Sequence, residues 1–144
     1  MHNYKELDMN VSDLPFMNFF TSRYSISFRI PAQKTYDYTK ANIMSFYVLS
    51  LGCLLKGLNA VPELRRRIID NKVVEYEQID GITPLMGDDQ LNREMRVSLP
   101  GKSETLRQWH DKIVNQQEAI LKNKEPAFSI DLQKRDTAPI ANFS

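Results

Sequence analysis

The stretch NAVPELRRRI, residues 59–68, decides the fold of this chain, together with the segment DNKVVEY that follows Ile69. Residues 59–68 follow a long apolar run and precede a segment in which apolar and polar residues alternate. Asp70 and Asn71 both tolerate the left-handed conformation that a tight hairpin needs. Apolar and acidic residues then alternate along VVEYE, as in a strand with one buried face. Two short strands around Asp70-Asn71 are therefore predicted over residues 68–78.

The apolar run before this stretch, residues 45–60, is hydrophobic on nearly all sides. A helix tolerates this pattern only when other structure surrounds it. Periodicity alone does not exclude strands, but the length favours a helix. Gly52 and Gly57 lower the helix propensity of this run, and they indicate that other parts of the chain pack closely against its backbone. Cys53 is expected to behave as a small hydrophobe. A buried central helix is the prediction.

Two elements are predicted before this helix. Residues 13–20 (DLPFMNFF) favour a short helix, because Pro15 falls near its first turn, where the missing N–H costs little. Residues 24–30 alternate strictly between large apolar and polar side chains, which predicts a strand with one buried face. Pro31 then ends that strand, since proline cannot donate to a sheet.

After the hairpin the pattern predicts a strand over residues 82–86, which Pro84 restricts to a sheet edge. Residues 87–101 are polar and irregular, and we expect a loop with at most one helical turn. Ser103 is the expected N-cap of an amphipathic helix whose apolar positions recur at helical spacing: Leu106, Trp109, Ile113, Val114, Ile120 and Leu121. Residues 128–132 alternate again, and a last strand and a frayed end stay open as alternatives.

Strands interspersed with long helices predict an α/β fold, a mixed sheet flanked by helices, in one domain over residues 1–144. The 19 Lys and Arg residues nearly balance the 18 Asp and Glu residues. No global field would therefore draw the chain to nucleic acid or to an anionic membrane. A lone cysteine and the lack of a visible export signal favour the reducing cytoplasm. No stretch approaches the ~20 apolar residues that span a bilayer.

The candidate catalytic side chains have simple structural interpretations. His110 is flanked by Asp111, but adjacent helical residues do not face each other, so a partly exposed structural histidine is favoured over a general base. His2 is expected in a mobile terminus. The two histidines and the single cysteine lie far apart in the sequence and do not have the spacing of metal ligands, so we predict no metal site.

The charged and aromatic clusters also leave alternatives. Arg65-Arg66-Arg67 suits an anion site, although a solvated or interface salt-bridge role is commoner. Asp88-Asp89 resembles half of a carboxylate pair, but charged loops are usually solvated. The aromatic residues between 16 and 28 could form the wall of a pocket for a small apolar ligand, or simply belong to the core.

The order of buried helix, N-A-x-P-E-L-R corner and hairpin over residues 45–76 resembles the chloramphenicol acetyltransferase family. The segment FMNFF at residues 16–20 looks like that family's H-F-x-x-F segment, so Phe19 carries over as a substrate-binding residue. The resemblance implies a homotrimer with active sites at the subunit boundaries. It also implies acetyl-CoA as cosubstrate, with no bound cofactor, and a small alcohol such as chloramphenicol as acceptor. In the family a histidine removes the acceptor's proton, and a serine stabilises the oxyanion.

Three departures from the family pattern limit what is expected of this chain. The late H-H-x-x-x-D-G motif, which carries the catalytic histidine, does not occur. The arginine that precedes the first helix in many members is replaced around Ser12-Asp13, and the link between Phe19 and Tyr24 is a few residues short.

From these departures we expect an incomplete, C-terminally shortened chloramphenicol acetyltransferase-like domain with no catalytic residue of its own. General-base catalysis is worth ~10²–10⁴-fold, so such a subunit would be nearly inactive alone. The alternative is a non-catalytic module for ligand binding or assembly. An unstable remnant without function is a third possibility.

Overall fold

The computed structural model describes residues 2–14, 27, 29–124 and 138–143. These residues form two three-stranded sheets and three α-helices, so the predicted α/β class is confirmed. The first sheet has the order β1-β3-β2, with strands Tyr4–Glu6, Lys72–Tyr76 and Arg66–Ile69. The second has the order β5-β4-β6, with strands Asn92–Val97, Asp80–Met86 and Ile140–Asn142. The second sheet is mixed, because β6 runs parallel to β4 while β5 is antiparallel.

The hairpin of β2 and β3 confirms the strand pair predicted from the sequence. Asp70 and Asn71 have φ angles of 49° and 60°, so both occupy the left-handed region that a two-residue turn of this kind requires. Ile69 pairs with Lys72 directly across the turn. A short 3-10 helix, η2 (Pro62–Arg65), forms the corner between helix α2 and this hairpin.

Strand β4 confirms the strand predicted around Pro84 and explains how proline fits there. Its pairing with β6 ends at Ile82, and beyond that residue β5 is its only described neighbour. Among the described residues, Pro84 therefore has a strand neighbour on one side only, a position in which a missing N–H disturbs no ladder.

The loop predicted over residues 87–101 is wrong in its middle, where residues 92–97 form strand β5. The alternating buried residues are Arg93, Met95 and Val97. Because the first of these buried residues, Arg93, is charged, the sequence does not show the usual alternation of apolar and polar residues. The burial of Arg93 is possible only because Asp89 in the preceding turn pairs with it.

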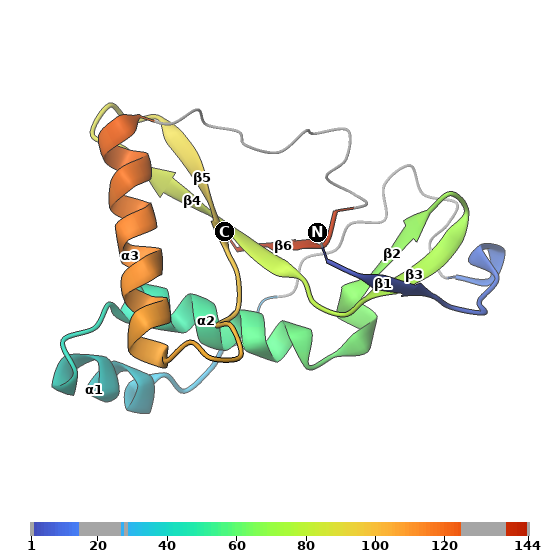
Figure 1. Cartoon of the computed structure of the whole chain (residues 1–144), viewed down its shortest axis with the longest axis horizontal. Coiled ribbons are helices and arrows are strands. Elements are labelled where there is room, and N and C mark those ends of the chain that lie inside the picture. Colours follow the sequence, from blue (N-terminus) through green and yellow to red (C-terminus); the bar gives the residue numbers. More distant parts are fainter. Residues whose placement is uncertain (1, 15–26, 28, 125–137, 144) are drawn as a thin grey trace.

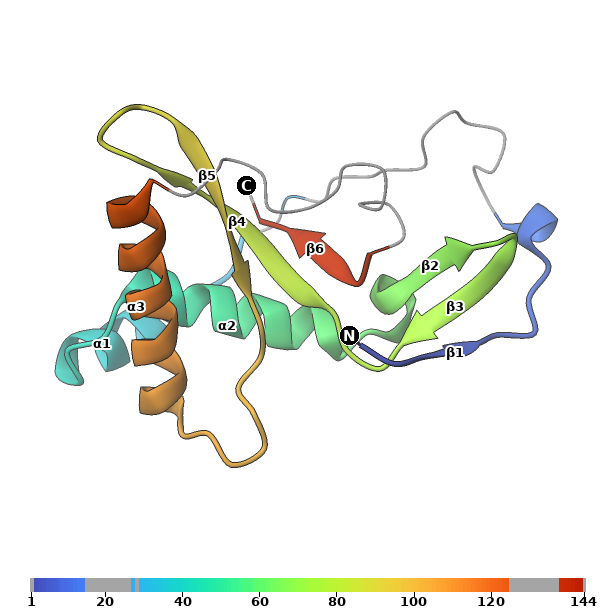
Figure 2. The same cartoon turned by 45° about the horizontal axis from the view of Figure 1, so that its top comes forward.

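Helix α2 (Phe46–Asn59) confirms the predicted central helix, with Ser45 as N-cap and Ala60 as C-cap. Its buried side chains pack with those of β4, β5 and helix α3 (Leu106–Asn123) in one core: Val48, Leu51, Leu55, Leu85, Met95, Val97, Trp109 and Ile113. Figures 1 and 2 both show that α3 crosses α2 near the N-terminal end of α2. The prediction that this helix is buried is only partly confirmed, because Phe46, Tyr47 and Cys53 are exposed.

The two glycines of α2 differ. A Cβ on Gly52 would lie 2.5 Å from the ring of Trp109, so the predicted close approach is confirmed there. No atom of the described residues lies within 4 Å of the Cβ position of Gly57, so the prediction of close packing is wrong at that residue.

Helix α3 confirms the amphipathic helix, but its N-cap is Thr105 and not Ser103. The Thr105 side chain accepts a hydrogen bond from the Gln108 backbone, and the Gln108 side chain accepts one from the Thr105 backbone. This reciprocal capping box fixes the start of the helix two residues later than predicted. Lys122 lies in the last turn, where the helix dipole favours a cation.

Several elements were not predicted, or fall outside the described residues. Helix α1 (Gln33–Ala41) and β1 were missed, because the first is largely polar and the second has only three residues. Most of the predicted helix over residues 13–20, most of the strand predicted over residues 24–30 and all of the strand predicted over residues 128–132 lie outside the described residues; Ser27, Arg29 and Ile30, which are described, are not in a strand. In the described part of the chain, no helix has the length and apolar character to cross a bilayer.

Candidate functional site

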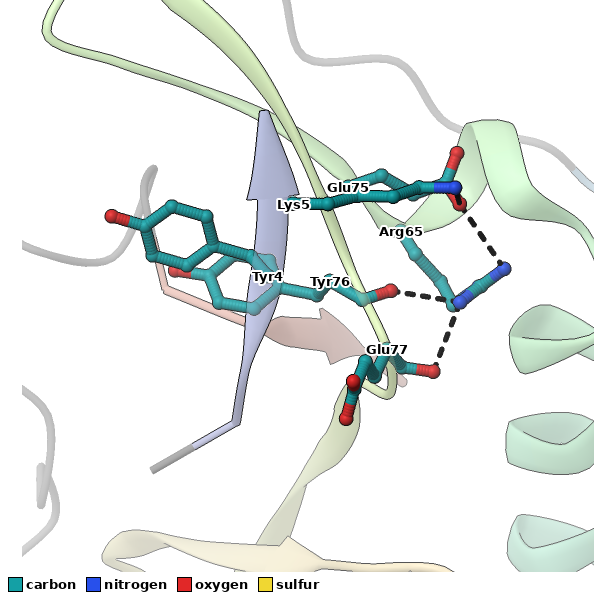
Figure 3. A pocket seen from close by; sticks show the side chains of 6 residues that line it. All are labelled: Tyr4, Lys5, Arg65, Glu75, Tyr76 and Glu77. Atoms are coloured by element: carbon teal, nitrogen blue, oxygen red, sulfur yellow. Dashed lines mark hydrogen bonds and ion pairs between the residues drawn. The ribbon is translucent and has the colours of Figure 1, made fainter. Parts of the chain in front are cut away.

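A pocket of about 330 Å³ opens beside the first sheet, where β1, β3 and η2 meet (Figure 3). Each of these elements contributes side chains to it: Tyr4, Lys5, Arg65, Glu75, Tyr76 and Glu77. The rings of Tyr4 and Tyr76 meet edge to face, with centroids 5.3 Å apart. The register of β1 against β3 pairs these two residues, so the aromatic wall follows from the sheet itself.

Glu75 is the centre of the charged side of this pocket. It pairs in register with Lys5 of β1 and with Arg66 of β2, so three charged residues align across the sheet. Its carboxylate lies 3.2 Å from Lys5 Nζ and 3.3 Å from Arg66 Nε. Burial opposes ionisation of Glu75, but the hydrogen bonds from Lys5 and Arg66 outweigh it and hold the pKa of this carboxyl below its ordinary value. Glu75 is therefore a permanent anion at neutral pH.

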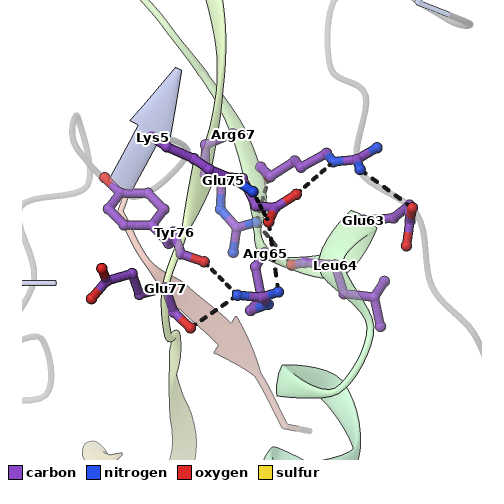
Figure 4. A network of polar contacts seen from close by, with 9 residues as sticks. Lys5, Glu63, Leu64, Arg65, Arg67, Glu75, Tyr76 and Glu77 are labelled. Atoms are coloured by element: carbon purple, nitrogen blue, oxygen red, sulfur yellow. Dashed lines mark hydrogen bonds and ion pairs between the residues drawn. The ribbon is translucent and has the colours of Figure 1, made fainter. Parts of the chain in front are cut away.

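Arg65 closes the other side of the pocket through the backbone (Figure 4). Its Nη1 donates to the carbonyl oxygens of Tyr76 and Glu77, at 2.7 and 2.9 Å. Its Nη2 lies 3.7 Å from the Glu75 carboxylate. Arg65 thus fixes the end of β3 against η2, and its Nε is buried without a hydrogen-bond partner.

Arg67 holds a different part of the fold. Its guanidinium donates to the carbonyl oxygens of Ala138 and Ile140, at 3.1 and 2.6 Å, and so ties β2 to the start of β6. The three consecutive arginines therefore have structural partners, and the ion-pair role predicted for them is confirmed for Arg65 and Arg66.

The pocket can bind a small polar molecule more readily than it can carry out proton transfer. Its carboxylate is already paired with cations, and burial raises the pKa of the Tyr76 phenol, which keeps that group protonated and therefore unable to accept a proton at neutral pH. The Lys5–Glu75 pair and Arg65 lie on one face of the sheet and the Tyr4 and Tyr76 rings point to the other, so the charged groups offer the recognition surface (Figure 3).

His110 lies elsewhere, and its surroundings correct two expectations. It is 5% exposed, so it is buried and not partly exposed. Its Nδ1 lies 2.8 Å from Asp111 Oδ1, although adjacent helical residues usually point apart. Its Nε2 accepts a hydrogen bond from the Ser45 backbone N–H at 2.8 Å, across 65 residues of sequence. The structural role predicted for this histidine is confirmed by these contacts.

His2 is held in place, and the prediction of a mobile terminus is wrong for this residue. Its Nε2 lies 3.0 Å from Asp80 Oδ2, and Arg96 Nε lies 2.7 Å from the same oxygen. Asp80 is 4% exposed, and its other oxygen has no hydrogen-bond partner. No local sequence signal indicates this contact, because its three residues come from three distant segments.

Asp88 and Asp89 have different surroundings. Asp88 is exposed, as predicted for a solvated loop. Asp89 instead binds the buried Arg93 through both carboxylate oxygens, at 2.8 and 2.6 Å. The hydrogen bonds from Arg93 hold the pKa of Asp89 well below its usual range. Asp89 is also exposed, as predicted, but in addition it forms a structural ion pair that the sequence did not indicate.

The predicted substrate-binding residue Phe19 lies outside the described residues, as does the rest of the FMNFF segment. Among the residues that are described, no group of three or more His, Cys, Asp or Glu side chains is placed to hold a metal ion.

Comparisons with known proteins support one coarse conclusion. No family model matches the chain, and no curated protein matches it. Among solved structures, one described as chloramphenicol acetyltransferase matches with a TM-score of 0.57 and 21% sequence identity. The match covers 86% of this chain and 61% of that protein, so the chain spans less than two thirds of its length. At this identity the likeness concerns the fold: the chain has a chloramphenicol acetyltransferase-like fold.

Proposed function

We propose that this chain is a subunit of a chloramphenicol acetyltransferase-like O-acyltransferase. Its substrates are acetyl-CoA and a small alcohol such as chloramphenicol. The observation that carries this proposal is the fold likeness, with a TM-score of 0.57 over 86% of the chain. The run of α2, the NAVPELR corner and the β2–β3 hairpin supports the same assignment. A homotrimer and a cytoplasmic location are part of the proposal.

The chain's own contribution is the acceptor side of the site, through Phe19. No catalytic residue is proposed within residues 1–144. His110 accepts the Ser45 N–H at Nε2 and contacts Asp111 through Nδ1, so it could take a proton from an alcohol only by losing the Ser45 bond. The general base, worth ~10²–10⁴-fold in rate, is therefore assigned to residues outside this sequence.

The activity part of the proposal is tested by following thiol release from acetyl-CoA with chloramphenicol and the purified chain. No turnover above background is expected. Robust turnover would show that the base lies within these 144 residues. The variants His110→Gln and His2→Asn, assayed in parallel, would then identify which histidine supplies it.

The binding part is tested by calorimetry. Weak binding of chloramphenicol and no binding of acetyl-CoA are expected, and Phe19→Ala should abolish the former. Phe46→Ala, which removes an exposed aromatic ring of α2, is the matched control and should leave binding unchanged. Acetyl-CoA binding, or chloramphenicol binding that Phe19→Ala leaves intact, would contradict an acceptor-only site.

The pocket beside Glu75 favours a second candidate, a non-catalytic binding module. Its charged side chains are paired within the fold, and the neighbouring Tyr4 and Tyr76 rings are held together by the register of the sheet. In that case Tyr4→Ala should weaken ligand binding while Phe19→Ala should not. The same calorimetric series therefore separates the two functions.

A further inference from the structure

The linker between α1 and α2, residues 42–45, has a strained backbone. Ile43 has a φ of 50°, in the left-handed region that a β-branched residue rarely adopts. It follows Asn42, the C-cap of α1, at the position where glycine is the usual residue. Its side chain is 90% exposed, so packing of that side chain does not offset the strain. Other contacts must hold the linker in this conformation.

The N–H groups of Ile43 and Met44 donate to the carbonyl oxygens of Lys40 and Thr39 in α1, at 3.4 and 2.9 Å, and two side chains of α3 supply further contacts. Arg107 donates to the carbonyl oxygens of Asn42 and Ile43, the latter at 3.3 Å. One turn further along, His110 Nε2 accepts the backbone N–H of Ser45 at 2.8 Å. Ser45 is also the N-cap of α2, and its hydroxyl accepts a hydrogen bond from the Val48 N–H at 3.3 Å. Hydrogen bonds thus connect the linker and the start of α2 to the same face of α3.

The protonation state of His110 follows from its partners. A backbone N–H can only donate, so Nε2 must present its lone pair to Ser45. The ring is therefore neutral with its hydrogen on Nδ1, where Asp111 Oδ1 accepts it at 2.8 Å. An imidazolium ring carries hydrogen on both nitrogens. It could still donate to Asp111, but it would present an N–H to the N–H of Ser45.

We propose that His110 is a proton-controlled latch on the 42–45 linker. When Nε2 takes a proton from solvent, its hydrogen bond from Ser45 is lost and the two N–H groups repel each other. The strain at Ile43 then favours a released linker, which keeps only its contacts with Arg107 and with the end of α1. Because α1 rests on α2 through the rings of Tyr36 and Phe46, with centroids 5.6 Å apart, release would loosen α1 as well.

The charged groups around His110 fit this assignment. On its own helix, Asp111 favours the imidazolium and Arg107, 3.9 Å from Asp111, opposes it. On the elements packed against α3, the ion pairs of Asp80 and Asp89 are made with residues other than His110. Asp80 pairs with Arg96, Asp89 holds Arg93, Glu94 lies on β5, and Lys56 of α2 is exposed. On α1, Lys40 lies over the Tyr36 ring and Asp37 bonds Gln33, while Lys34 is exposed.

Amide hydrogen exchange, read by NMR on the full chain, tests the latch. As the pH is lowered and the ring takes a proton at Nε2, the protection of the Ser45 amide should fall, after correction for the intrinsic exchange rate. Amides of the β4–β5 ladder should keep their protection as the pH is lowered. A Ser45 amide with pH-independent protection would overturn the proposal.

The variant His110→Gln gives the matched control. A glutamine oxygen can accept the Ser45 N–H and does not titrate, so the Ser45 amide should stay protected at every pH. An unchanged pH response in His110→Gln would show that another group controls the linker and would also overturn the proposal. If this variant does not fold, the ¹⁵N spectrum of the wild-type imidazole decides the question. A ring protonated at Nε2 at pH 8 contradicts the latch, and one protonated only at Nδ1 supports it.

Discussion

Asn59 and Ile79 are joined by a pair of hydrogen bonds between a side-chain amide and a backbone peptide. Asn59 Nδ2 donates to the Ile79 carbonyl oxygen at 3.0 Å, and its Oδ1 accepts the Ile79 N–H at 2.9 Å. The last residue of α2 thus imitates a strand neighbour for the residue just before β4. Ile79 is 1% exposed, so no solvent could replace either bond. The asparagine of the NAVPELR corner therefore couples the central helix to the second sheet.

Asn59→Ala should destabilise the chain by about 1–3 kcal/mol, because it leaves a buried N–H and a buried C=O unsatisfied. Urea unfolding followed by circular dichroism measures this change. Asn115→Ala, at an exposed position of α3, is the matched control and should be neutral or slightly stabilising through helix propensity. Equal effects of the two substitutions would mean that the Ile79 contacts contribute nothing.

Gly52→Ala should destabilise the chain, although alanine is the better helix former. The added Cβ would lie 2.5 Å from the Trp109 ring, which is 1% exposed and has no room to move. Overpacking of this kind costs about 1–3 kcal/mol, more than the ~1 kcal/mol that alanine gains over glycine in a helix. Gly57→Ala in the same helix has open space and should stabilise by up to about 1 kcal/mol. Effects of the same sign at both positions would contradict the packing of Trp109 on Gly52.

Thr105→Ala should cost about 1 kcal/mol of stability, since it removes the capping oxygen of α3. Ser103→Ala should change stability by less than about 0.5 kcal/mol, because Ser103 is an exposed residue outside the helix. Thermal unfolding of both variants distinguishes the two candidate caps. A larger loss in Ser103→Ala would place the start of the helix where the sequence alone predicted it.

Glu75 makes stability depend on acidic pH. Its pKa in the folded chain lies below the value of 4.5 for an unperturbed glutamate, so the unfolded chain binds the proton more readily. The stabilisation is fully present above pH 4.5 and is lost as the pH falls through the lower, folded-state pKa. Denaturation of wild type and Glu75→Gln between pH 7 and 3 should show the variant weaker at neutral pH, with the difference shrinking below pH 4.5.

Glu118→Gln, which changes an exposed glutamate of α3, is the control for this pH series and should differ little from wild type throughout. A difference between wild type and Glu75→Gln that stays constant down to pH 3 would show that the Lys5 and Arg66 contacts do not depend on the charge of Glu75.

The candidate site was only partly visible in the sequence. The three arginines and both histidines were recognisable as candidates, and the favoured roles of Arg65 and Arg66 as ion-pair residues were correct. The pocket itself was not predicted, because it needs β1 beside β3, and a three-residue strand has no periodicity to detect. Phe19, the one residue assigned to substrate, stays a prediction.

The sequence by itself determined the elements whose signals are local: α2 from a long apolar run, the hairpin from Asp70 and Asn71, and α3 from its apolar spacing. Tertiary structure alone decided which polar groups could be buried. Arg93 fills a core position of β5 because Asp89 folds back onto it, and His110 is buried because the backbone of Ser45, 65 residues away, donates to it. Burying a polar group is favourable only when a partner is present, and for His110 that partner comes from a distant segment of the chain.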